Sequence, residues 1–144
     1  MTSSDYEKEL HIALLAVQRA TLLTKSVFHT TAKGTLSKSD HSPVTIGDFG
    51  AQALIIAAIK HNFPSDEVVG EEDASDLRQN EDLREKVWGY VQQAKLANDK
   101  AENELGGPIE NVEKMMDVLD QGNSEGGAKG RIWALDPIDG TKGF

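Results

Sequence analysis

The pattern of apolar and polar positions predicts two long helices in the first half of the chain. Across residues 5–29, apolar side chains recur at steps of three and four, the spacing of one helical face. Residues 49–63 are apolar on most sides, which predicts a buried second helix that Pro64 ends. The first helix is expected to bury Leu10, Ala13, Leu14, Val17 and Ala20 and to expose Glu7, Lys8, Gln18 and Arg19.

The segment between these two helices is predicted to lack helical structure. Residues 30–42 are polar and contain a glycine, which predicts a surface loop. Residues 42–48 are expected to form a short strand or an extended lead-in. Asp48 is then well placed to cap the second helix at its N-terminus.

Two short strands are predicted in the remainder of the chain. Residues 67–72 contain adjacent valines and end in Glu71 and Glu72, which predicts a strand that leads into two acids. Residues 131–135 are expected to form a second, buried strand. The other predicted segments are a helix beginning near Asp82, a loop over 98–108, a helix over 112–119 capped by Asn111, and a glycine-rich connection over 121–131.

Composition favours one cytoplasmic domain. The chain has 144 residues, of which 38% are hydrophobic, enough for a single core. It contains no cysteine, which excludes disulfides, thiolate metal sites and a cysteine nucleophile. Its first residues lack the basic and apolar regions of a secretory signal, and no unbroken apolar run approaches the length of about 20 residues that spans a bilayer.

The charge balance limits the class of partner. A net charge of −9 argues against a nucleic acid polymer, because proteins hold phosphate backbones with lysine and arginine. An acidic chain can still act on a small phosphate, provided that cations mask its carboxylates. Phosphate chemistry in this chain would therefore depend on metal ions. The charged stretch 73–98 and the four scattered histidines are interpreted as solvated or packing residues.

The most specific signal follows the second predicted strand. Asp136 and Asp139 lie three positions apart, with Pro137 between them fixing the turn. Both carboxylates can then face one centre, together with the backbone carbonyl of Ile138. Carboxylate and carbonyl oxygens are the ligands that Mg²⁺ prefers.

The next residues supply a possible phosphate site. Gly140 and Thr141 would begin a helix, where free N–H groups bind anions. Metal ions and backbone amides on opposite sides of one phosphate form a phosphoryl-transfer site.

Three groups of acidic residues are expected to lie close together. Each group lies at the end of a strand-like segment, where ligands of open sheets bind. They are Asp48, then Glu71 with Glu72, then Asp136 with Asp139. Each group alone has a simpler explanation: the first as a helix cap, the second as a solvated charge pair and the third as a proline turn.

Several motifs resemble one known family. Residues 133–141, with Gly70-Glu71-Glu72 upstream, are similar to the inositol monophosphatase superfamily of lithium-sensitive, Mg²⁺-dependent phosphomonoesterases. The similarity is closer to its fungal 3′(2′),5′-bisphosphate nucleotidase branch, whose connection between Glu71 and Asp136 is long. Further similar segments are residues 42–48 followed by Gln52, residues 68–72, residues 123–131 and residues 139–144.

The resemblance implies an α+β fold. Residues 1–144 would form the N-terminal domain of a layered αβαβα sandwich, in which long helices pack on a mixed or antiparallel sheet. Family members continue into a C-terminal α/β domain that residues 1–144 do not include. This second domain would have to be supplied in cis or as a separate fragment, and residues 1–144 alone are expected to have little or no activity.

The resemblance also implies roles for individual residues. The expected metal ligands are Glu71, Asp136, Asp139 and the carbonyl of Ile138. Asp48 and Thr141 are expected to orient and activate the attacking water. Gly140 and Thr141 are expected to bind the phosphate.

The implied reaction is hydrolysis of adenosine 3′,5′-bisphosphate to AMP and phosphate by a metal-activated water. Two or three Mg²⁺ ions would take part and Li⁺ would inhibit. The 3′-phosphoadenylyl sulfate of sulfur assimilation is a second implied substrate, with adenylyl sulfate as its product. The alternatives are an inositol monophosphatase, an inositol polyphosphate 1-phosphatase, or a regulatory module that binds metal or phosphate without turnover.

Overall fold

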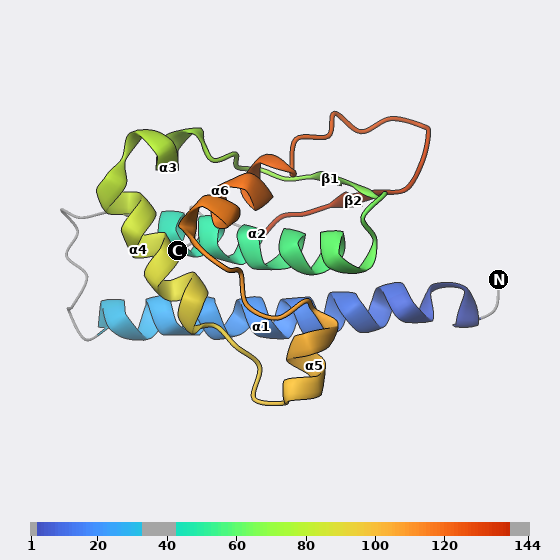
Figure 1. The fold of residues 1–144 in the computed structure, drawn as a ribbon, viewed down its shortest axis with the longest axis horizontal. Coiled ribbons are helices and arrows are strands. Elements are labelled where there is room, and N and C mark those ends of the chain that lie inside the picture. The colour runs from blue at the N-terminus through green and yellow to red at the C-terminus, as the bar shows by residue number, and fades with distance from the viewer. Residues whose placement is uncertain (1–2, 33–42, 139–144) are drawn as a thin grey trace.

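The computed structural model describes residues 3–32 and 43–138 of the chain. Most of the predicted loop 30–42 lies outside the described residues, and its first three residues belong to the first long helix. The elements are η1 (Ser3–Tyr6), α1 (Glu7–Ala32), α2 (Pro43–Asn62), β1 (Glu67–Val69), α3 (Ser75–Gln79), α4 (Glu81–Gln93), α5 (Asp99–Glu104), α6 (Val112–Asp120) and β2 (Ile132–Ala134) (Figure 1).

Helix α2 is the centre of the fold. It runs antiparallel to α1 along most of its length, and α4 and α6 also pack on it (Figure 1). Its buried alanines, Ala51, Ala53 and Ala58, let neighbouring elements approach closely. By length and composition alone α2 could cross a membrane, but 67% of its most apolar window is buried inside the structure. We interpret it as the core helix of a globular fold.

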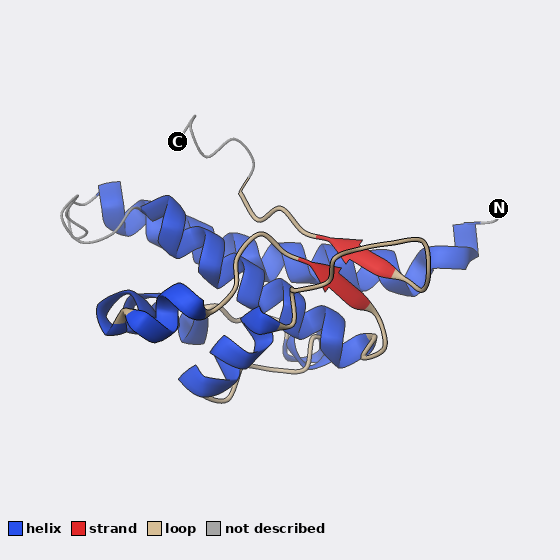
Figure 2. Cartoon of the chain, turned by 90° about the horizontal axis from the view of Figure 1, so that it is seen from above, coloured by secondary structure: helices blue, strands red, loops and turns tan. Residues whose placement is uncertain are grey.

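The two strands pair in parallel beside α2. Their register aligns Glu67 with Ile132 and Val69 with Ala134, and Figure 2 shows the two arrows side by side and pointing the same way. On the other side of β1, the glycine-rich connection adds an antiparallel bridge between Val69 and Asn123. The described sheet is therefore small and mixed, and the expected α+β class is confirmed.

Side-chain contacts anchor the start of β2 to the end of α2. The Trp133 ring stacks on Phe63 with ring centroids 5.6 Å apart. The Trp133 indole and the Arg131 guanidinium both donate to Oδ2 of Asp66, at 2.8 and 2.7 Å. This anchor fixes the direction in which β2 runs, and thus where the residues that follow it emerge.

The predicted apolar face of α1 is wrong at three of its five positions, whereas Ala20 is buried as predicted. Leu10, Leu14 and Val17 are 61%, 55% and 54% exposed in the described structure. The buried face instead consists of Ile12, Ala16, Arg19, Ala20, Leu23 and Val27. Both sets recur at helical spacing because α1 is apolar on two sides, so periodicity alone could not choose between them.

Arg19 was expected on the polar side but is completely buried. Its Nη1 lies 2.7 Å from Oε2 of Glu102 and also donates to the carbonyl of Gly107. Its Nη2 donates to the carbonyl of Leu54. A buried charge is tolerated when it is paired and hydrogen-bonded. Glu102, which lies on α5, supplies the negative counter-charge for Arg19.

Two further predictions about helices are wrong. Residues 43–48 are not extended, because α2 already begins at Pro43, a residue type favoured at the first position of a helix. Asp48 therefore lies inside α2 and is not its N-cap. The predicted loop 98–108 contains α5, which the Asn98 side chain caps by accepting a hydrogen bond from the N–H of Ala101.

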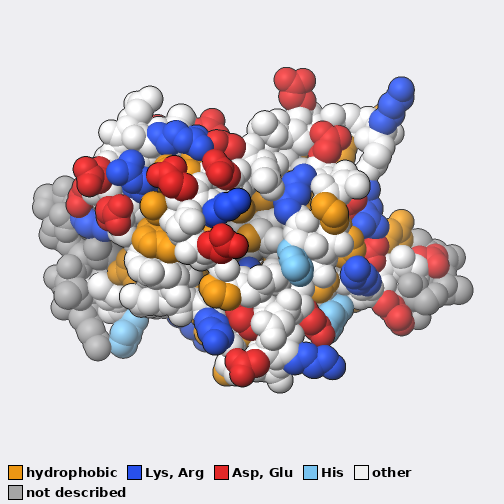
Figure 3. Space-filling view, in the orientation of Figure 1, with side chains coloured by type: hydrophobic (Ala, Val, Ile, Leu, Met, Phe, Trp, Pro, Cys, Tyr) orange, Lys and Arg blue, Asp and Glu red, His pale blue; other side chains and the backbone are white. Residues whose placement is uncertain are grey.

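The remaining elements follow the sequence more closely. Helix α4 begins at Glu81, and α6 is capped by Asn111 as predicted. The segment 73–98 also contains α3, which was not predicted. The charged side chains of the segment 73–98 are interspersed over α3 and α4 in Figure 3, in agreement with a solvated face. The second strand is present, but it is half-buried and its Ala134 is exposed, so the prediction of a buried strand is wrong.

Candidate active site

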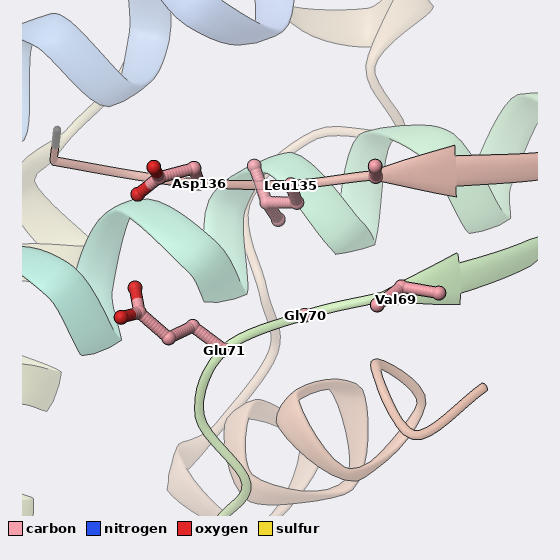
Figure 4. A pocket seen from close by; sticks show the side chains of 6 residues that line it. Val69, Gly70, Glu71, Leu135 and Asp136 are labelled. Carbon is pink, nitrogen blue, oxygen red and sulfur yellow. The ribbon is translucent and has the colours of Figure 1, made fainter. Parts of the chain in front are cut away.

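Glu71 and Asp136 lie at the carboxyl ends of the two parallel strands. Because the register pairs Val69 with Ala134, each acid stands two residues beyond the same rung of the sheet. The N–H of Leu135 donates to the carbonyl of Val69 at 2.9 Å, which extends the pairing toward the acids. Figure 4 shows both carboxylates at this end, beyond the arrowheads of the strands.

The two strand ends enclose an open pocket. It has a volume of about 300 Å³ and is lined by Val69, Gly70, Glu71, Ala134, Leu135 and Asp136 (Figure 4). Parallel strands present their carboxyl ends at one edge, where ligands of such sheets collect. The structure thus brings Glu71 and Asp136 to one pocket, and their expected role as metal ligands stays a prediction.

Asp48 faces the same region from α2. Its side chain is buried, and its Oδ1 has no hydrogen-bond partner among the described residues. Burial, and to a smaller extent the charges of Glu71, Glu72 and Asp136, raise the pKa of the Asp48 carboxyl to about 6. These charges, which come from the described residues, are all acidic. Asp48, Glu71 and Asp136 are called the acidic cluster below.

Glu72 lies at the margin of the cluster. Burial and then the charges of Glu71, Asp76 and Asp73 raise the pKa of the Glu72 carboxyl above its usual value. The turn therefore carries several carboxylates that repel one another. Such a concentration of negative charge is stabilised when a cation binds.

The turn after β2 runs back against the first turns of α2. A Cβ placed on Gly47 would lie only 3.0 Å from Cδ1 of Ile138, so the glycine leaves room for this side chain. The side chain of Ile138 thus packs against the residue before Asp48, and the expected role of its backbone carbonyl stays a prediction. Asp139, Gly140 and Thr141 lie outside the described residues, and their expected roles stay predictions.

The donor chemistry of the acidic cluster fits a hard divalent cation. Carboxylate oxygens are preferred Mg²⁺ ligands, and the buried Oδ1 of Asp48 has no hydrogen-bond partner within the described part of the chain. Within residues 3–32 and 43–138, however, no three acidic or histidine side chains come close enough together to hold a metal ion. The described residues supply ligands for a cation but do not surround one.

Gln52 contributes to the site, although its side chain was not predicted to do so. Gln52 lies one turn after Asp48 on α2. The oxygen of its side-chain amide accepts hydrogen bonds from the backbone N–H groups of Glu71 and Glu72. Residues four apart share a helical face, so this spacing was the available signal. The spacing did not predict a shared face, because residues 42–48 were expected to be extended and not helical.

Comparison with known proteins gives the family. The model of the inositol monophosphatase family matches residues 5–144. The chain is 60% identical over 139 residues to the 3′(2′),5′-bisphosphate nucleotidase of Emericella nidulans, covering 96% of this chain and 40% of that protein. It is 51% identical over 148 residues to 3′(2′),5′-bisphosphate nucleotidase 1 of Candida albicans, covering 99% of this chain and 40% of that protein.

The similarity extends to plants. The chain is 39% identical over 146 residues to 3′(2′),5′-bisphosphate nucleotidase 1 of Arabidopsis thaliana, covering 96% of this chain and 40% of that protein. The chain thus spans about two-fifths of the length of the curated relatives that it matches. Because the family model covers nearly all of its residues, the chain belongs to the inositol monophosphatase family.

Proposed function

We propose that this chain supplies the metal-binding part of a Mg²⁺-dependent phosphomonoesterase that acts on 3′(2′),5′-bisphosphate nucleotides. The observation that carries the proposal is the acidic cluster, in which burial, and then the charges of Glu71, Glu72 and Asp136, raise the pKa of Asp48 to about 6. The names of the relatives, all of them bisphosphate nucleotidases, support the substrate class.

The proposed substrate is adenosine 3′,5′-bisphosphate, with 3′-phosphoadenylyl sulfate as a second one. Both carry a phosphate monoester next to a further anionic group. A site made of carboxylates would repel such a molecule unless cations lie between them. This requirement supports a metal-dependent reaction, with Mg²⁺ as the proposed ion and Li⁺ as the proposed inhibitor.

The residues have distinct proposed tasks. Glu71 and Asp136 would hold the cation, together with Asp139 and the carbonyl of Ile138. Bound Mg²⁺ would lower the pKa of a water and offset the charge that develops on the phosphate oxygens. Asp48 would accept a proton from the attacking water at Oδ1, an atom to which residues 3–32 and 43–138 offer no hydrogen bond.

The segment outside the described residues has proposed tasks by similarity alone. Thr141 would orient the water together with Asp48. Gly140 and Thr141 would bind the phosphate through backbone N–H groups. Residues that grip the adenine and ribose are not assigned to this chain, and residues 1–144 alone are proposed to turn over little substrate.

A chimera tests the proposed function. Residues 1–144 would replace the matched segment of the Emericella nidulans nucleotidase, and phosphate release would be measured with and without Mg²⁺. We expect Mg²⁺-dependent release from adenosine 3′,5′-bisphosphate that Asp136→Asn reduces to background. Glu113→Gln, which alters an exposed acid on α6, is the control and should leave the rate unchanged.

The same experiment separates the alternatives. Faster release from inositol phosphates than from the nucleotide would indicate an inositol phosphatase. Cation binding without turnover of any substrate would indicate a regulatory module. Activity that persists in Asp136→Asn would contradict the assignment of the site.

A further inference from the structure

We propose that Gln52 is a positioning residue, which holds the backbone of Glu71 and Glu72 so that the Glu71 carboxylate faces Asp136. Through this contact it sets the affinity of the acidic cluster for a divalent cation. The inference rests on the proposed function, in which that cluster binds the cation.

The Gln52 amide makes three hydrogen bonds to one short stretch of backbone. Its Oε1 accepts from the N–H of Glu71 and from the N–H of Glu72, both at 3.1 Å. Its Nε2 donates to the carbonyl of Glu72 at 2.5 Å. The residue is 0% exposed, so water does not compete for these groups.

The backbone needs this partner because it leaves the sheet at Gly70. The N–H of Gly70 still donates to the carbonyl of Gly122, next to the bridge on the outer side of β1. For Glu71 and Glu72 the acceptor is the side chain of Gln52. A helix side chain thus takes the place of a neighbouring strand at the point where the first acid emerges.

Two glycines let the amide fit closely. A Cβ on Gly70 would lie 2.8 Å from Nε2 of Gln52, closer than real contacts allow. A Cβ on Gly122 would lie 3.4 Å from the same atom and 2.9 Å from Cδ1 of Ile56. The amide is therefore confined between α2 and the turn, and small shifts of the turn are restricted.

The residue type suits the task. An amide can accept from two N–H groups and donate to a carbonyl at the same time, whereas a carboxylate can only accept. Glutamate would also add a negative charge beside Glu71 and Glu72. Because Asp48 and Gln52 lie one turn apart on α2, the same helical face supplies one acid directly and positions another.

The test compares cation affinity with stability. The probe is Mn²⁺ alone, added to the chain of residues 1–144 and followed by electron paramagnetic resonance. Gln52→Met keeps the length of the side chain but removes its hydrogen bonds, and we expect Mn²⁺ to bind about 10- to 100-fold more weakly, as for other residues that orient metal ligands. Thermal unfolding of each variant is measured in parallel.

A matched control lies on the same helix. Asn62 donates from Nδ2 to the carbonyl of Glu104 at 2.8 Å, which joins the end of α2 to the end of α5, remote from the acidic cluster. Asn62→Ala should lower the melting temperature and leave the Mn²⁺ affinity within about twofold, since it orients no ligand. An equal loss of affinity in Asn62→Ala would show a general effect of stability and overturn the inference.

A second variant keeps the inference testable if Gln52→Met does not fold. Gly70→Ala places a methyl group against the Gln52 amide and should weaken Mn²⁺ binding in the same direction. Unchanged affinity in a folded Gln52→Met or Gly70→Ala chain would overturn the inference while leaving the proposed function intact. Failure of the unsubstituted chain to bind Mn²⁺ would remove the proposed cation site and the inference with it.

Discussion

Arg19 and Glu102 form a completely buried ion pair that ties α1 to α5, with 2.7 Å between Nη1 and Oε2. Glu102 also accepts the N–H of Leu96 at its other oxygen. The pair therefore fastens the segment after α4 onto the two long helices. We expect Glu102→Ala to destabilise the fold by about 3–5 kcal/mol, because Arg19 would remain buried without a counter-charge.

Urea unfolding would measure this loss. The double variant Arg19→Met with Glu102→Leu should recover much of it, since no buried charge is then left unpaired. Equal instability of the single and double variants would contradict this account of the pair.

Asp48 makes the stability of the cation-free chain depend on pH. The folded state raises the pKa of this carboxyl from 3.8 to about 6, so the folded state binds the proton more tightly than the unfolded state. The resulting stabilisation is fully present below pH 3.8 and is lost as the pH rises through 6. Asp48→Asn removes this pH dependence because asparagine stays neutral, and at pH 7 it should raise the free energy of unfolding by about 1–2 kcal/mol relative to the unsubstituted chain.

This difference is measured by urea unfolding at pH 4.5 and pH 7 in the presence of a chelator. The difference in the free energy of unfolding between Asp48→Asn and the unsubstituted chain should be small at the lower pH and larger at the higher pH. Equal differences at both pH values would show that the Asp48 carboxyl does not titrate in this range.

The two apolar faces of α1 should respond differently to substitution. Leu14 is 55% exposed and Leu23 is 1% exposed in the described structure. Leu14→Lys should change the free energy of unfolding by less than about 0.5 kcal/mol. Leu23→Ala should cost about 2–5 kcal/mol, because it leaves a cavity beside α2. Thermal unfolding compares the two, and a large loss in Leu14→Lys would mean that this face is covered.

Two helical glycines provide a matched pair. A Cβ on Gly50 would lie 2.5 Å from Cδ1 of Leu23, whereas a Cβ on Gly89 would meet no atom within 4 Å. Gly50→Ala should destabilise by about 1–3 kcal/mol through overpacking. Gly89→Ala should stabilise α4 by about 0.5–1 kcal/mol, because alanine loses less backbone entropy in a helix. Chemical unfolding of both variants checks the opposite signs.

The sequence was sufficient to predict that Glu71 and Asp136 follow two strands whose ends lie together. Glu71 and Asp136 each follow a short apolar segment, and the pairing of such segments brings their ends together. Asp48 faces the same region, but it does so from inside α2 and not as the N-cap after an extended segment. The predicted extended segment includes Pro43, although proline also fits the first position of a helix, where the structure places it.

Tertiary pairing explains what could not be predicted. Arg19 is far from Glu102 in sequence, separated by 83 positions, and only the folded chain shows that its charge is balanced. Gln52 contacts the turn after β1 through hydrogen bonds to backbone atoms, which carry no sequence pattern of their own. Local periodicity therefore gave the elements more reliably than the side chains that join them.

The parallel pairing of β1 and β2 also has a consequence for the order of folding. At the start of the strands, Asp66 and Arg131 meet although 65 positions separate them, so this pairing closes a long loop and loses much chain entropy. The local helices α1 and α4 can form earlier, since they close no such loop. The acids at the strand ends would then come together in a late step. A bound cation should in that case slow unfolding much more than it accelerates refolding.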